Sequence, residues 1–107
     1  MITVLVVGPP ADLDAAASRN PSVELLHAAG LEDLLDRLAR NRRIDAVLLL
    51  VEAETAREMA ATVLEEDPAA PPMFVPSGPA SPGVRSLDAS SADDLLRSIA
   101  RELRADS

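Results

Sequence analysis

The chain has 107 residues, 48% of them hydrophobic and 26% charged, with a formal net charge of −8 and no cysteine. These values predict one domain, residues 1–107, with a modest core, and they exclude disulfides and thiolate metal sites. The acidic charge argues against nucleic acid as a partner, and because no apolar run approaches the roughly 20 residues of a membrane span, we expect no membrane insertion and a cytoplasmic location.

The chain opens on an apolar run, residues 2–7, that lacks the basic flank of a signal peptide and is predicted to be a strand. Gly8-Pro9-Pro10 stops this strand, because proline cannot donate to a sheet. A short helix with a weak apolar stripe is expected at about 11–18. Residues 23–28 then alternate in polarity, which is typical of an edge strand with one wetter face.

A second helix is predicted over about 31–42, with acids in its first turn and arginines at its end, as the helix dipole favours. Its apolar residues recur at helical spacing and should face the core; they are Leu31, Leu34, Leu35, Leu38 and Ala39. The next segment, 45–51, contains six consecutive apolar residues, which indicates a strand covered on both faces. We take this strand as the centre of the fold.

The second half repeats the alternation of helix and strand. A third helix is predicted over about 54–66, a fourth strand near 72–76 and a fifth near 84–88. Residues 77–83 between these strands are rich in proline, glycine and serine and are predicted to be a loop. Ser91, with Asp94 three residues on, resembles a capping box that opens a last helix to about residue 104.

This order predicts an α/β fold of the flavodoxin-like, doubly wound type: five parallel strands in the order 2-1-3-4-5, with the helix between strands 4 and 5 reduced to a loop. At this length the chain resembles a response-regulator receiver domain. The resemblance spans nearly the whole chain. It rests on element order, on spacing and on the run Asp45-Ala46-Val47-Leu48-Leu49, which is similar to the third strand of that family.

The resemblance does not extend to the catalytic motif. Receivers carry two adjacent acids after the first strand, a phosphoacceptor aspartate after the third, a serine or threonine after the fourth and a lysine after the fifth. The corresponding positions here are, in that order, Gly8 and Pro9 (or Pro9 and Pro10), Leu50, Ser77, and Leu87 or Asp88. Phosphoryl transfer to aspartate needs a carboxylate and a divalent ion. The resemblance therefore implies a degenerate receiver, or pseudo-receiver, with no catalytic residue, metal or cofactor.

Other candidate groups have simpler explanations. His27, the only histidine, lies at the end of an edge strand and is expected to face solvent or to play a structural part. Glu52, Glu54 and Glu58 could gather a metal, but acids are expected at the start of a helix for electrostatic reasons. The arginines at the end of the second helix are interpreted as a solvated helix end.

We therefore expect a non-catalytic protein-interaction module in bacterial signalling or protein localisation, not phosphorylated on aspartate, that binds a protein partner or a second copy of itself. The alternative is a small-molecule-binding or enzymatic flavodoxin-like domain of unknown ligand. A ligand site would form a polar pocket at the carboxyl ends of the strands, whereas an interaction module would expose an apolar patch or dimerise.

The missing helix between strands 4 and 5 suggests where a partner docks. Leaving one face of these strands wet would forgo several kcal/mol at about 25 cal/mol per Å². Either the loop 77–83 folds over that face or another chain covers it, and we expect a partner because the loop has little apolar bulk. The predicted surface comprises Met73, Phe74, Val75, Pro79, Val84 and Arg85. Phe74 would be its main contact if its side chain faces that way.

Overall fold

The computed structural model describes residues 2–8, 13–40, 43–76, 84–87 and 91–105. Five strands form one sheet in the order β2-β1-β3-β4-β5, and all neighbouring pairs are parallel. The strands are β1 (Ile2–Val7), β2 (Val23–Ala28), β3 (Ala46–Leu49), β4 (Met73–Val75) and β5 (Val84–Ser86). The helices are α1 (Leu13–Arg19), α2 (Leu31–Arg40), α3 (Ala53–Glu66) and α4 (Ala92–Ala105). The predicted flavodoxin-like architecture is confirmed.

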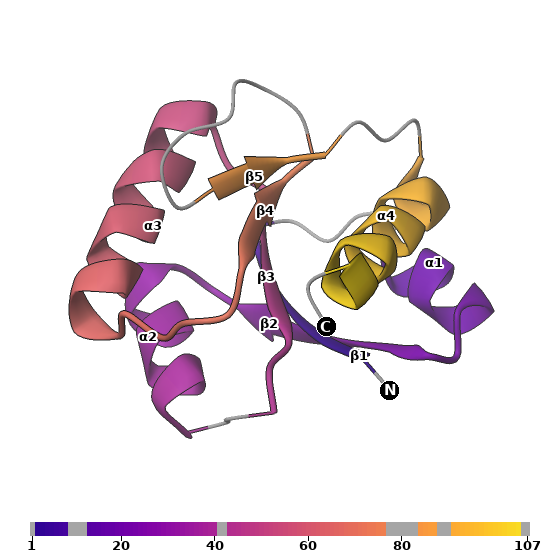
Figure 1. The fold of residues 1–107 in the computed structure, drawn as a ribbon, viewed down its shortest axis with the longest axis horizontal. Coiled ribbons are helices and arrows are strands. Elements are labelled where there is room, and N and C mark those ends of the chain that lie inside the picture. The colour runs from indigo at the N-terminus through magenta and orange to yellow at the C-terminus, as the bar shows by residue number, and fades with distance from the viewer. Residues whose placement is uncertain (1, 9–12, 41–42, 77–83, 88–90, 106–107) are drawn as a thin grey trace.

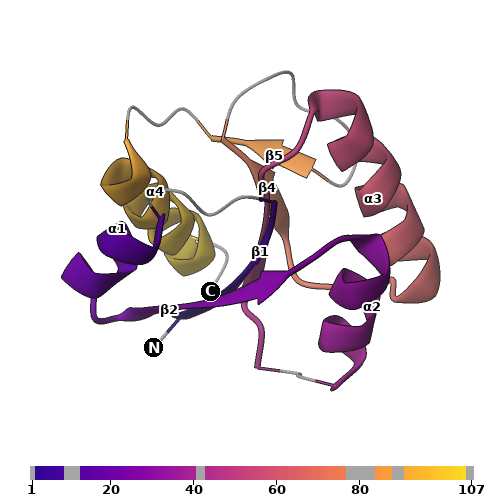
Figure 2. The same ribbon diagram turned by 180° about the vertical axis from the view of Figure 1, so that it is seen from behind.

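The sheet is the middle of three layers. Helices α2 and α3 lie on one face, and α1 and α4 lie on the other (Figures 1 and 2). The two faces carry separate clusters of buried side chains, one with Leu34 of α2 and Val63 of α3, the other with Leu96 and Ile99 of α4. The central strands β1 and β3 contribute to both clusters, which explains why their sequences are apolar without alternation.

Several elements are shorter than the sequence predicted. The strands expected at 45–51, 72–76 and 84–88 cover only 46–49, 73–75 and 84–86. Helix α2 is described from Leu31 to Arg40, and residues 41–42, where the predicted helix was to end, lie outside the described residues. Asp45 shows the reason at one end: its Oδ2 accepts the backbone N–H of Thr3 at 2.9 Å, so its side chain completes the pairing that a further strand residue would make. The last helix starts as predicted, with Ser91 Oγ accepting the backbone N–H of Asp94 at 3.2 Å.

The sheet face beside β4 and β5 is covered within the chain, contrary to our expectation that a partner covers it. No helix lies between these strands among the described residues; residues 77–83 lie outside them. Met73, Val75 and Val84 are nevertheless buried in the same cluster as α3, which contacts both strands (Figure 1). The small residues Ala56 and Ala60 form the buried side of α3, and small side chains allow a helix to lie close to a sheet.

Phe74 points to the opposite face. Its exposed fraction is 0%, and it belongs to the cluster that includes Leu96 and Ile99 of α4. Its cross-strand neighbour is Arg85, whose guanidinium carbon lies 5.9 Å from the ring centroid. The condition for Phe74 to contact a partner is therefore not met, and the ring is part of the core. Of the predicted docking residues, Arg85 is exposed and Pro79 lies outside the described residues.

Helices α1 and α4 are joined by a polar contact at their facing ends. Arg19, in the last turn of α1, forms two bonds to Asp93 of α4: Nη2 to Oδ2 at 2.6 Å and Nε to Oδ1 at 3.2 Å. Asn20 donates to the same Oδ1 at 3.2 Å. The hydrogen bond from Arg19 lowers the pKa of the Asp93 carboxyl and raises the pKa of the guanidinium. This contact links the two helices beside the buried side chains that pack them against the same face of the sheet.

Candidate functional site

In open parallel sheets, ligands and reactive groups gather at the carboxyl ends of the strands. The described part of this edge includes Gly8 after β1, Leu50 after β3 and Leu87 after β5. These are three of the positions where the receiver resemblance places functional residues. The others, Pro9, Ser77 and Asp88, lie outside the described residues.

Gly8 and Leu50 meet in direct backbone contact. Gly8 has φ +108°, and a Cβ added there would lie 2.4 Å from the Leu50 carbonyl oxygen and 3.0 Å from the Leu50 Cβ. The Leu50 N–H donates to the carbonyl of Val7 at 2.8 Å, which holds the end of β3 against the end of β1. Only glycine tolerates both this φ and this separation. A side chain at position 8 would therefore collide with the backbone of Leu50, the residue at the phosphoacceptor position.

Leu87 turns away from the edge. Its N–H donates to the carbonyl of Val75 at 2.9 Å, and its side chain is buried in the cluster under α4. A leucine here adds to the core and offers no charge to a phosphoryl group. None of the three residues Gly8, Leu50 and Leu87 carries a carboxylate or an ammonium group.

The titratable groups near this edge form a pair instead of a metal cluster. His27 Nε2 lies 3.1 Å from Asp14 Oδ1, and both side chains are well exposed. The sequence had suggested no partner for His27. Glu54 lies 3.9 Å from Arg57, and Glu52 only precedes the first turn of α3. Among the described residues, no group of three His, Cys, Asp or Glu side chains has the arrangement that could hold a metal ion.

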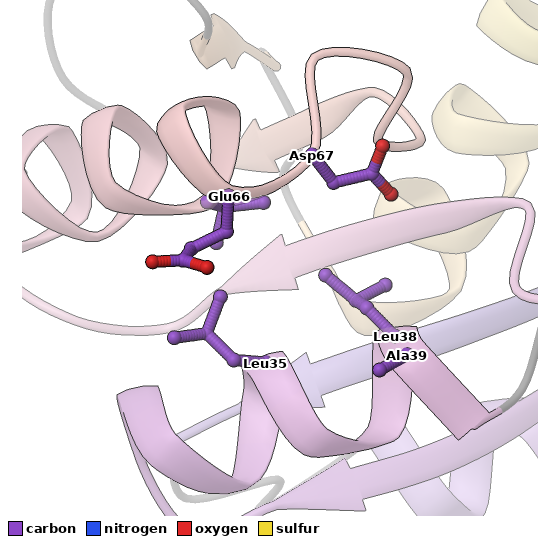
Figure 3. A pocket seen from close by; sticks show the side chains of 6 residues that line it. Leu35, Leu38, Ala39, Glu66 and Asp67 are labelled. Atoms are coloured by element: carbon purple, nitrogen blue, oxygen red, sulfur yellow. The ribbon is translucent and has the colours of Figure 1, made fainter.

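A groove at the opposite end of the sheet was not predicted. It lies between the second half of α2 and the end of α3, has a volume of about 360 Å³, and is lined by Leu35, Leu38, Ala39, Val63, Glu66 and Asp67 (Figure 3). The sequence placed Leu35, Leu38 and Ala39 in a buried stripe, but the first two are half-buried and Ala39 is exposed. The signal that could have revealed the groove is the run of acids at the end of α3.

No family model and no curated protein matches the chain. Among solved structures it is similar to the E. coli constitutive lysine decarboxylase, with a TM-score of 0.66 and 14% identity; the match covers 98% of this chain and 17% of that one. It is also similar to a chain in the crystal structure of the phosphorylated P1 domain of CheA3 in complex with CheY6 from R. sphaeroides, with a TM-score of 0.61, 21% identity, and coverage of 96% and 97%.

At these identities the likeness shows a common fold. The chain spans about a sixth of the decarboxylase chain but nearly the full length of the chain from the signalling complex. None of the helices in the described part of the chain is both long enough and apolar enough to cross a membrane.

Proposed function

We propose that this chain is a non-catalytic, receiver-like protein-interaction module that works in signalling without being phosphorylated on aspartate. The observation that carries the proposal is the contact between Gly8 and Leu50 at the carboxyl edge of the sheet. This contact is stronger support than the changes of residue type alone, because it also removes the space for a metal-binding side chain at position 8.

The chemistry of phosphoryl transfer explains why this contact matters. The transferred group needs a carboxylate to accept it and a divalent ion to neutralise its developing charge. Leu50 supplies no carboxylate, Gly8 supplies no metal ligand, and the chain contains no lysine that could pair with the phosphoryl oxygens. A chain that keeps the order of strands and helices of a receiver but lacks this chemistry still has the surfaces of the fold. These surfaces can bind other proteins.

The comparison with known structures supports the signalling part of the proposal. The match of nearly full length is to a chain from a complex between two signalling proteins, the P1 domain of CheA3 and CheY6. The fold of the present chain is thus one that occurs in a protein–protein signalling complex. The partner of this chain is proposed to be a protein, either another chain or a second copy.

The proposal predicts that Mg²⁺ does not stabilise the protein specifically. A ligand that binds the native state at 100 times its Kd adds about 2.7 kcal/mol to the free energy of unfolding, and a ligand that does not bind adds nothing. We expect the melting temperature in millimolar Mg²⁺ to equal that in NaCl of the same ionic strength. The NaCl control is needed because screening alone changes the stability of a chain with net charge −8. A rise specific to Mg²⁺ would reveal a metal site and refute the proposal.

A further inference from the structure

The groove between α2 and α3 exposes apolar surface that the fold does not use. Leu35 and Leu38 point from α2 towards the last turn of α3, and Glu66 extends from α3 towards the same space (Figure 3). Val63 is fully buried and forms the floor. Leu35 and Leu38 stand at i and i+3, with Ala39 at i+4, so together they present a continuous apolar strip along the helix.

The charged residues that line this groove, Glu66 and Asp67, are both acidic. The arginines in the last turn of α2, Arg37 and Arg40, pair with Asp33 and Asp36 of their own helix. Glu65, Glu66 and Asp67 are exposed at the end of α3, and the last turn of this helix has no basic residue. The helix dipole makes a carboxylate at this end unfavourable. The other three helices follow the favourable pattern, with arginine in the last turn. No ion pair involves Glu65, Glu66 or Asp67 within the described residues.

An apolar strip beside carboxylates without a cationic partner is complementary to a cationic amphipathic partner; Asp67 Oδ1 accepts only the backbone N–H of Ala69, at 3.1 Å, which leaves its charge in place. Such a partner would bury its apolar face on the leucines and place its basic residues beside Glu66 and Asp67. A second copy of this chain is a weaker candidate, because each copy carries a net charge of −8 and the two would repel each other. A basic partner is attracted by that same charge, which also accelerates association.

Resting on the proposed function, we propose that the α2–α3 groove, lined by Leu35, Leu38, Ala39, Val63, Glu66 and Asp67, binds a basic amphipathic helix of a partner protein. The contact lies at the ends of α2 and α3, which in a parallel sheet with returning helices is the end opposite to Gly8 and Leu50. Binding there is independent of chemistry at the carboxyl edge.

A synthetic amphipathic helix of leucine and lysine is the probe, and isothermal titration calorimetry is the measurement. Two further peptides serve as comparisons: a scrambled peptide of the same composition with no apolar face, and an amphipathic peptide of leucine and glutamate. We expect the leucine–lysine helix to bind and each of the others to bind at least about tenfold more weakly, a difference of about 1.4 kcal/mol. Three results would overturn the proposal. Equal binding of the scrambled peptide would show that charge alone attracts the probe. Equal binding of the leucine–glutamate peptide, or no binding of the leucine–lysine peptide, would show that the groove does not select a basic helix.

Matched variants locate the binding site. Glu66→Arg should weaken binding of the leucine–lysine helix about tenfold, whereas Glu58→Arg, the same charge reversal near the middle of α3, should weaken it much less. Ala39→Gln should obstruct the groove without changing the charge, and Ala61→Gln, at an exposed alanine of α3, should not affect binding. Equal effects within either pair would place the site elsewhere.

The Glu66→Arg variant also reports on folding. Arginine at the end of α3 complements the helix dipole, so we expect this variant to melt at a higher temperature while binding more weakly. Loss of binding accompanied by a lower melting temperature would point to misfolding and contradict this interpretation.

Sedimentation of the parent chain and of Glu66→Arg provides a further test: a dimer that dissociates in the variant would show that a second copy occupies the groove. Failure of these tests would leave the Mg²⁺ prediction standing, whereas a Mg²⁺ response would overturn the proposed function itself.

Discussion

Replacing Phe74 with alanine should lower the free energy of unfolding by about 3–5 kcal/mol, a large part of the 5–15 kcal/mol typical of a small domain. Phe74 is the only aromatic residue, is fully buried, and belongs to the cluster of side chains between the sheet and α4. Alanine would leave a cavity in this cluster. Urea denaturation followed by circular dichroism measures the loss.

Arg85→Ala is the control for this variant. It removes the cation that lies 5.9 Å from the Phe74 ring centroid but keeps the ring in the core, so its effect should stay within about 1 kcal/mol. If Phe74→Ala costs no more than Arg85→Ala, the ring does not fill the core. Partner binding that disappears in Phe74→Ala should be attributed to loss of folding unless the circular dichroism spectrum is unchanged.

Gly8→Ala should destabilise the protein by about 2–4 kcal/mol, the sum of the strain of a positive φ and the crowding of an added methyl group. The new Cβ would lie 2.4 Å from the carbonyl oxygen of Leu50. This atom belongs to the backbone directly after β3, which the hydrogen bond from the Leu50 N–H to the Val7 carbonyl holds in place, and it cannot rotate away as a side chain could. Gly8→Asp, which restores the acid of a receiver, should be destabilised at least as much. Thermal and urea denaturation measure both.

Gly30→Ala is the matched control, because the same substitution there meets no atom within 4 Å. Gly30 does not have a positive φ, so alanine should leave stability unchanged or raise it by about 0.4–1 kcal/mol through the unfolded state. A Gly8→Ala variant as stable as Gly30→Ala would mean that the edge has room for a side chain, and the argument from geometry would fail.

The topology could be predicted from the sequence because it depends on strong, local patterns. Residues 2–7 and 46–49 are apolar without alternation, which requires cover on both faces, and the helical spacing between them sets the order of elements. The family resemblance then supplied the strand order. The edge position of β2 and the alternation of its side chains were predicted correctly, since Val23 and Leu25 face α1 and α4 whereas Leu26 and Ala28 face α2. The expectation of one wetter face was wrong, because each face carries one buried, one half-buried and one exposed residue.

The features that could not be predicted depend on contacts between distant segments. Arg19 and Asp93 are separated by 74 positions, and nothing local pairs them. β4 has only three residues, all buried, so its sequence does not show which face Phe74 occupies. The cover that α3 provides over β4 and β5 depends on how closely its alanines approach the sheet. The sequence indicated that Gly8 could not bind a metal, but not that the backbone of Leu50 fills its place.

The groove between α2 and α3 was missed for a related reason. Periodicity identifies the apolar side of α2 but not how much of that side the neighbouring helix covers. Leu35 and Ala39 lie at the margin of the stripe, where the position of α3 decides their exposure. The acids at the end of α3 contradict the dipole rule that the other helices follow, and this local exception was visible in the sequence.

The central claim is our proposal that this flavodoxin-like chain has no phosphorylation chemistry, and intact-mass spectrometry after incubation with acetyl phosphate and Mg²⁺ tests it most directly. A catalytically competent receiver domain in the same reaction shows that the donor is active. We predict that the competent domain gains one phosphoryl group while the present chain keeps its unmodified mass, because Leu50 offers no nucleophile and Gly8 no metal site. A stoichiometric gain of one phosphoryl group by this chain would contradict the account.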